Sequence, residues 1–371
     1  MANTLCSIPY QDLFKLQDDI TTAVAGALQA KLLGGADTAT QSDRPPSGNL
    51  AAYNAYLQGQ FYSAIHTEAD LRKAIEAYST ATRLDPRYAL AYVGLSLRWV
   101  GLAGQSLDGA PAQQALAQAR AAADTALALE PNLAAAHGAR GVLFLNGDFN
   151  WTGAEAQFRR AVQLAPNDGP AKSNLGVLLA TLGQAEPAVE LIRQALLTDP
   201  LHASWYSGLA GYLAGLGRLD EAEQAVRKAI ELQPAAAGYH TQLAIIAIQR
   251  GDAKGALAAA QQEPAADGWQ EPALALAQQI SGNRAAADAA LQTLIDTQSN
   301  AAAYQIAEVY ALRKDAENMF AWLDRAWASR DPGIRQLLYD PFILRYKDDP
   351  RFAAFCRKVG LPTTTTAKAL P

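Results

Sequence analysis

The sequence ASWYSGLAGYLAGLGRLDEAEQAVRKAIELQP, residues 203–234, decides the fold. Its first half places Leu209, Ala210 and Leu213 at helical spacing, and Gly217 then interrupts the pattern with a turn residue. The second half keeps apolar residues at helical spacing as far as Pro234, which cannot continue a helix. The stretch therefore predicts a hairpin of two short helices.

The same pattern precedes it in GPAKSNLGVLLATLGQAEPAVELIRQALLTDP, residues 169–200. We expect the small residues Gly176 and Ala188 to let the two helices of this hairpin approach closely, and the large Ile192 to fill the space beside them. A proline closes each of five such units at successive gaps of 45, 35, 34 and 34 residues: Pro86, Pro131, Pro166, Pro200 and Pro234. A period near 34 indicates a stacked array of helical hairpins.

Weaker copies of the pattern extend over residues 50–332 and bring the total to about eight units. The 45-residue gap fits an 11-residue insertion between Gly101 and Gln113, and the 35-residue gap fits one extra residue in the turn at 147–151. Since one hairpin alone leaves an apolar face in water, the units must stack. The predicted fold is an all-α, right-handed superhelical solenoid of about eight hairpins.

Composition changes along the chain predict five parts. Residues 1–33 form an amphipathic N-terminal helix, and residues 34–49, rich in Pro, Gly and Ser, form a linker. The solenoid covers 50–332. Residues 333–362, crowded with large apolar side chains, form a C-terminal cap, because a solenoid needs an atypical end element. Residues 363–371 form a flexible tail.

The bulk composition excludes several classes of protein. Half of the 371 residues are hydrophobic and 18% are charged, which is typical of a folded chain, and the net charge of −5 disfavours binding to nucleic acid. Two cysteines, Cys6 and Cys356, cannot build a disulfide framework. The sequence shows neither a signal peptide nor a run of about 18 apolar residues. We therefore expect a cytoplasmic protein with no membrane span.

In these motifs, residues 50–332 resemble tetratricopeptide-repeat (TPR) proteins. YQDLFKLQDDI at 10–20, AAYNAYLQG at 51–59 and DPRF at 349–352 resemble the entry and exit of the TPR regions of bacterial class III adenylate cyclases and winged-helix transcription regulators. The resemblance implies the sensor or partner-binding part of a signalling protein. Because the family's effector domain has no counterpart before residue 12, it further implies a truncated product or a stand-alone remnant.

No arrangement of residues predicts catalysis. The four histidines, at positions 66, 137, 202 and 240, form no metal-ligand pattern, and no phosphate-binding or nucleophile motif occurs. We expect no metal, no cofactor and no enzymatic activity. Two alternatives stay open: the substrate-binding repeat region of a transferase or other enzyme, and an assembly scaffold in an envelope complex.

The concave groove, which in the resembling family is lined by the first helix of each unit, is the predicted functional surface. The inward positions carry small, neutral or apolar residues rather than the Lys and Arg that clamp an acidic chaperone tail. We therefore predict that the groove binds an apolar or backbone-rich peptide or helix of another protein. The candidate residues are Ser173, Asn174, Val177, Ser207, Gly208, Gly211, Thr241, Gln242, Ile245, Tyr304 and Glu308.

Two further expectations concern this surface. Trp269 lies between two prolines and is a candidate exposed contact residue. As an alternative to a partner, the helix expected at residues 12–33 fills the groove, since a helix packs in a groove by the same physics within one chain as between two.

Overall fold

A computed structural model describes residues 43–63, 67–105, 109–265 and 268–368. Every element discussed below lies in the compact unit Pro45–Pro371. The N-terminal helix predicted at 1–33, and most of the linker at 34–49, lie outside the described residues.

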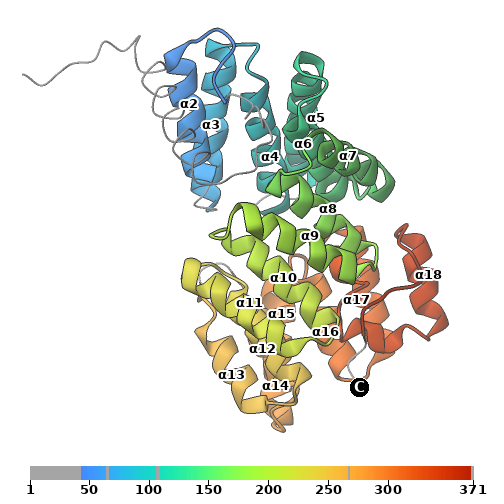
Figure 1. Cartoon of the computed structure of the whole chain (residues 1–371). Helices are drawn as coiled ribbons and strands as arrows, with labels where there is room; N and C mark the ends of the chain where they lie inside the picture. The colour runs from blue at the N-terminus through green and yellow to red at the C-terminus, as the bar shows by residue number, and fades with distance from the viewer. Residues whose placement is uncertain (1–42, 64–66, 106–108, 266–267, 369–371) are drawn as a thin grey trace, which may run out of the picture. The chain divides into compact units, whose positions relative to one another are not determined.

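The described residues contain 17 α-helices and no strand, which confirms the predicted all-α array (Figure 1). Sixteen of the helices pair as eight successive hairpins. They are α2 (Leu50–Ser63) with α3 (Glu68–Leu84), α4 (Ala89–Gln105) with α5 (Gly109–Leu129), α6 (Ala134–Val142) with α7 (Trp151–Leu164), α8 (Gly169–Thr181) with α9 (Ala185–Thr198), α10 (Ala203–Gly215) with α11 (Leu219–Leu232), α12 (Tyr239–Gln249) with α13 (Ala253–Gln262), α14 (Gln270–Gln278) with α15 (Arg284–Gln298), and α16 (Ala303–Leu312) with α17 (Ala316–Ala328).

Small residues bring the helices of a hairpin together, as the repeat pattern predicts. A Cβ atom added to Gly176 of α8 would lie 3.2 Å from Ile192 Cδ1 and 3.3 Å from the Ala188 carbonyl oxygen, both on α9. One added to Gly141 of α6 would overlap the Phe158 ring of α7. The absence of a side chain at these two positions is what lets the large residue of the second helix pack against the first.

The two irregular gaps between prolines have structural explanations. The 11-residue insertion lengthens both helices of its hairpin, because α4 has 17 residues and α5 has 21 whereas α8 and α9 have 13 and 14. The single extra residue enters the helix that continues α6, where residues Leu143–Asp148 form a π-helical turn. A π-turn adds one residue without breaking the helix. Phe149, with a left-handed φ of 52°, then turns the chain into α7.

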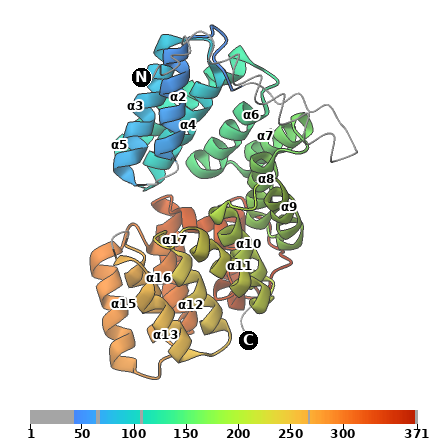
Figure 2. The ribbon, with the colours of Figure 1, turned by 60° about the vertical axis from the view of Figure 1, so that its left-hand side comes forward.

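The chain after the last hairpin has little regular helix. It forms two 3₁₀ turns, η4 (Pro332–Gln336) and η5 (Ile343–Tyr346), and the short helix α18 (Pro350–Lys358). Six apolar residues of these turns and their connection are fully buried: Ile334, Leu337, Leu338, Phe342, Ile343 and Leu344. The turn η4 contacts α8, α16 and α17, and the red C-terminal part lies next to α17 in Figures 1 and 2. A single apolar core continues from the α6–α7 turn to residue 367.

Candidate functional site

The first helices of the hairpins form the inner row of the array. Each packs on the first helix of the next hairpin, whereas successive second helices make no comparable contact among the described residues. A stack in which only one row is in mutual contact curves toward that row. The inner face is therefore built from the first helices: α2, α4, α6, α8, α10, α12, α14 and α16.

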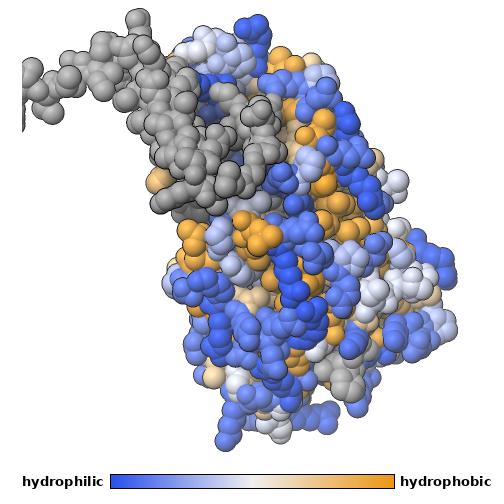
Figure 3. Space-filling model, in the orientation of Figure 1, coloured by the Kyte–Doolittle hydropathy of each residue, from blue (hydrophilic) through white to orange (hydrophobic). Residues whose placement is uncertain are grey.

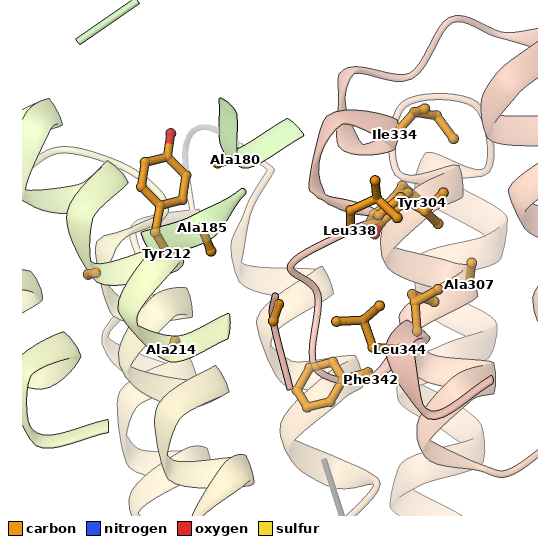
Figure 4. Close-up of a cluster of buried hydrophobic side chains, with 14 of the residues drawn as sticks. Ala180, Ala185, Tyr212, Ala214, Tyr304, Ala307, Ile334, Leu338, Phe342 and Leu344 are labelled. Carbon is orange, nitrogen blue, oxygen red and sulfur yellow. The ribbon is translucent and has the colours of Figure 1, made fainter. Parts of the chain in front are cut away.

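The chain's own C-terminal segment, defined here as residues 332–346, occupies the inner face between α6 and α12. Its turn η4 packs against α8, and the Arg335 Nη1 group donates to Asn146 Oδ1 in the π-helical turn that continues α6 (2.8 Å). The Tyr339 ring meets the Tyr212 ring of α10 edge to face, with centroids 5.3 Å apart. Figure 4 shows side chains of α8, α10, α16 and the C-terminal segment in this one cluster.

A glycine on α10 makes room for this segment. A Cβ atom on Gly215 would overlap the Tyr339 carbonyl oxygen, so no larger residue fits there without a shift of the backbone. The residues predicted as a flexible tail lie against the same helices. The Thr366 N–H donates to Gly183 O (2.9 Å) and the Lys368 N–H donates to Gly215 O (2.8 Å), so the described part of the tail borders the turns after α8 and α10.

Contacts between distant hairpins close the array onto itself. The Trp151 Nε1–H group at the start of α7 donates to the Val359 carbonyl at the end of α18 (2.8 Å), and the bond is buried. The Phe149 and Trp327 rings lie 5.6 Å apart. The predicted cap thus does more than cover α16 and α17: it also joins them to hairpins far earlier in the chain.

Four of the predicted groove residues meet at one small cavity under the C-terminal segment. Gly211, Gln242, Ile245 and Glu308 line a space of about 60 Å³. The other lining residues are Ala210, Ala214, Ile246, Gln336, Tyr339, Asp340 and Pro341. A Cβ atom added to Gly211 would meet nothing within 4 Å. The cavity can hold one or a few water molecules but not a peptide.

Two other predicted groove residues hold the fold together. Thr241 is buried, and both its N–H (2.7 Å) and its hydroxyl (2.9 Å) donate to Glu263 Oε2. The same carboxylate accepts the Gly238 N–H (2.5 Å), so Glu263 caps the start of α12. Tyr304 is fully buried, and its hydroxyl donates to Asp340 Oδ2 (2.9 Å).

The remaining predicted groove residues lie on α8 and α10 in ordinary packing. Ser173 is buried, and Asn174 and Val177 are half-buried, with the Asn174 amide 3.6 Å from where a Cβ atom of Gly138 would be. Gly208 is half-buried beside the Tyr212 ring. The Ser207 carbonyl accepts a hydrogen bond from Gln242 Nε2 (3.3 Å), which links α10 to α12. These residues take part in helix contacts, and their role in a partner-binding groove stays a prediction.

Residues that the sequence analysis did not select complete the site. Asp340 is 3% exposed and accepts from Tyr304 and from the Phe342 (2.8 Å) and Ile343 (3.2 Å) N–H groups. It also shares a hydrogen bond with Glu308, which is 5% exposed. Burial, and then the charge of Asp340, raise the pKa of Glu308 well above its ordinary value. In the sequence, the visible sign of this pair is that Asp340, followed by Pro341, interrupts an otherwise apolar run.

The first helix of the array carries a second candidate surface. A shallow hollow of about 380 Å³ lies on α2 and is lined by Asn54, Leu57, Gln58, Phe61 and Tyr62. Phe61 is 65% exposed and Leu57 is 39% exposed. No residue of α2 is acidic or basic.

Exposed large hydrophobic side chains are few, and Figure 3 shows apolar patches among polar ones on one face. In the described residues they are Leu57, Phe61, Leu84, Leu197, Leu201 and Trp269. Trp269 precedes α14 and is 39% exposed; its role as a contact residue stays a prediction. The described residues contain no cluster of three metal-ligating side chains and no helix long and apolar enough to span a membrane.

Comparisons with known proteins agree with this architecture. The tetratricopeptide-repeat family matches residues 143–211 and, through a second profile, residues 206–235. Residues 143–235 are therefore similar to tetratricopeptide repeats. Tetratricopeptide arrays are protein-binding modules, and they present extended concave surfaces. No curated protein matches the sequence significantly.

Among solved structures, the chain is similar to a thermophilic TPR protein of Thermus thermophilus, with 21% identity, 50% of this chain and 92% of that chain covered, and a TM-score of 0.41. It is also similar to YrrB, a TPR protein with an unusual peptide-binding site (22% identity, 49% and 87% covered, TM-score 0.30). A third similar structure is PilW, a type IV pilus biogenesis factor (20% identity, 58% and 92% covered, TM-score 0.44).

Proposed function

We propose that the chain is a non-enzymatic protein-binding module that docks an uncharged amphipathic helix of a partner protein on the outer face of α2. Because its segments at 10–20, 51–59 and 349–352 resemble the entry and exit of the TPR regions of adenylate cyclases and winged-helix regulators, we assign the module to a bacterial signalling or transcription-regulating protein. The observation that carries the proposal is the exposed pair Leu57 and Phe61 at the end of the stack.

The end of a repeat array normally needs a polar outer face, because no further repeat covers it. In α2 this face instead carries the large apolar side chains of Leu57 and Phe61, which lie with Asn54 on one side of the helix. The 14 residues of α2 include no Asp, Glu, Lys or Arg. Neighbouring exposed apolar side chains of this kind indicate an interaction surface.

The chemistry of α2 selects the partner. Each inner helix of the array already packs on the next one, so a partner helix on α2 would continue the stack by the same geometry. The residues that line the face carry no charge, the Lys73 ammonium of α3 lying at its edge 5.3 Å from the centre of the Tyr62 ring, and an unpaired charge buried against the face would be strongly unfavourable. The partner helix must therefore present a neutral, apolar stripe.

The central inner face is the less suitable site because the C-terminal segment already fills it. Displacing this segment would expose six fully buried apolar side chains, each stabilised by about 1.5–3 kcal/mol. A peptide would have to compensate for that loss before it gained any affinity. The proposal therefore keeps the predicted apolar chemistry of the partner and moves its position toward α2.

Site-specific photo-crosslinking in cells tests the proposal. A benzophenone amino acid replaces Phe61 in one variant and Leu201, which is also well exposed, in the control. We expect position 61 alone to crosslink to one helical segment of a partner with a neutral apolar stripe, and Phe61→Asp to abolish binding of the synthetic segment while Leu201→Asp does not. A partner that is a cyclase or a winged-helix regulator would support the signalling role.

Three outcomes would contradict the proposal. They are equal crosslinking at both positions, crosslinking at position 61 to a second copy of this chain only, and full protection of Phe61 in the purified chain. Clear turnover in cyclase or transferase assays of the purified chain would contradict the non-enzymatic assignment.

A further inference from the structure

A buried pair of carboxyl groups joins the C-terminal segment to the array. Glu308 lies on α16, one helical turn after Tyr304, and Asp340 lies in the connection between η4 and η5. Both side chains are almost fully buried and hydrogen-bonded to each other. They line the small cavity on the inner face. Two carboxylates cannot form this bond unless one of them carries a proton.

The hydrogen-bond partners show which group carries the proton. Asp340 already accepts from the Phe342 and Ile343 N–H groups and from the Tyr304 hydroxyl, as a carboxylate does. The Glu308 side chain hydrogen-bonds to Asp340, and this bond adds to the rise in the pKa of Glu308. Burial raises the pKa of Asp340 as well, but the bonds that Asp340 accepts, including this one, act to lower it. Glu308 is therefore the donor and Asp340 the acceptor of the shared proton.

We propose that Glu308 and Asp340 form a proton-dependent latch, in which the proton that they share fastens the C-terminal segment to α16 and its loss loosens residues 337–343 on the inner face. This device concerns the filled part of the inner face and is independent of partner binding at α2.

Few groups around the pair could stabilise the second negative charge that loss of the proton would create. From α16 the neighbour is Tyr304, and from the C-terminal region they are Asp331, Arg335 and Tyr339. Arg335 is the only cation among them, and its guanidinium is bonded to Asn146 and to the Pro332 carbonyl. From α10 and α12 the cavity receives only uncharged side chains, including that of Gln242. A second buried negative charge would therefore face repulsion with no new partner.

The direction of the pH effect follows from linkage. Burial and the Asp340 charge raise the pKa of Glu308, whereas in a loosened, solvated segment this pKa returns to its ordinary value. At a pH below the ordinary pKa of a glutamate, Glu308 is protonated in both the packed and the loosened state, and the segment stays packed. Between the two values the loosened state binds fewer protons, so each pH unit of increase favours it about tenfold. Above the raised value the effect levels off.

Hydrogen exchange read by mass spectrometry tests this latch. In the full chain, protection of the amides in residues 337–343, corrected for the intrinsic exchange rate, should fall about tenfold per pH unit above the ordinary carboxyl pKa and then level off. In Glu308→Gln the amide still donates to Asp340 and has no proton to lose, so protection should not vary with pH. Glu190→Gln, on the exposed face of α9, is the matched control and should keep the wild-type profile.

A wild-type profile without pH dependence, or the same dependence in Glu308→Gln, would overturn the latch. If Glu308→Gln does not fold, Asp340→Asn replaces it: loss of the Asp340 charge should lower the pKa of Glu308, so the fall in protection should level off at a lower pH than in the wild type. Infrared spectroscopy adds a variant-independent readout: the wild type at neutral pH should show the carbonyl band of a protonated buried carboxyl group. Absence of this band would also refute the proposal.

Discussion

Tyr339 stands edge-on against Tyr212, with their ring planes 89° apart, and so anchors the C-terminal segment to the middle of the helical array. Tyr212 is buried and Tyr339 is half-buried against the same apolar core, and burial raises the pKa of Tyr339 to about 12. The contact joins α10 to a turn that follows the last hairpin. It makes the C-terminal segment part of the inner face rather than an appendage to the last unit.

Two glycines of α10 should respond in opposite ways to the same substitution. Gly215→Ala places a methyl group against the Tyr339 carbonyl, a backbone atom that cannot turn aside, and should lower the free energy of unfolding by about 1–3 kcal/mol. Gly211→Ala fills open space and should raise it by about 0.5–1 kcal/mol, because alanine favours helix. Urea unfolding of both variants measures the difference; equal effects would contradict the position of the C-terminal segment.

Gly176→Leu should destabilise the array by about 1–3 kcal/mol through overpacking. The added side chain would meet Ile192 and the Ala188 carbonyl of α9, which already leave only 3.2–3.3 Å to a Cβ atom. Leu179→Met, a change of similar volume in the same helix, is the control and should cost less than about 1.5 kcal/mol. An unchanged melting curve for Gly176→Leu would show that the hairpin register is wrong.

Glu263→Gln should destabilise the start of α12 by about 1–3 kcal/mol. The carboxylate accepts hydrogen bonds from the Gly238 and Thr241 N–H groups, and the NH₂ group of glutamine could not accept the bond from one of them. Glu263 is 2% exposed, so water cannot replace the lost bond. Glu231→Gln changes an exposed residue paired with Lys228 and should alter stability by less than about 0.5 kcal/mol. Thermal unfolding followed by circular dichroism compares the two; equal effects would argue against the cap.

Cys356 should resist alkylation in the folded protein. Burial raises the pKa of its thiol to about 11, so near pH 8 the reactive thiolate is about one part in a thousand. Iodoacetamide treatment followed by peptide mass mapping should leave Cys356 unmodified in buffer and modify it fully in denaturant. Its modification should become faster as the pH rises toward 11, and rapid labelling near pH 8 would contradict the buried position of α18.

The repeat pattern predicted the elements well because it records short-range contacts. Gly176, Ala188 and Ile192 lie within one unit, and their types and spacing are those required by two helices in close contact. The extra residue before Pro166 was also visible as a spacing of 35, although only the structure shows that a π-turn accommodates it. Each of these features depends on residues that are close together in the sequence.

The candidate groove was predicted less completely. Its positions were chosen from two well-formed hairpins, and the prediction did not include the segment that fills the space between them. Gly211 and Gln242 do line a common cavity with Glu308. The hydroxyl groups of Thr241 and Tyr304 instead donate hydrogen bonds to Glu263 and Asp340. The identity of these partners depends on where the chain returns, which no local pattern encodes.

That this chain consists of stacked helical hairpins could be inferred from its residues alone, because the period of apolar, small and proline residues is a property of each unit and its neighbour. That the array closes on itself and fills its own inner face could be learned only from the folded chain. That outcome depends on the small rotation between successive hairpins, which accumulates along the stack until residues 332–346 meet α8 and α10. A sum of many small angles leaves no signature in any single repeat.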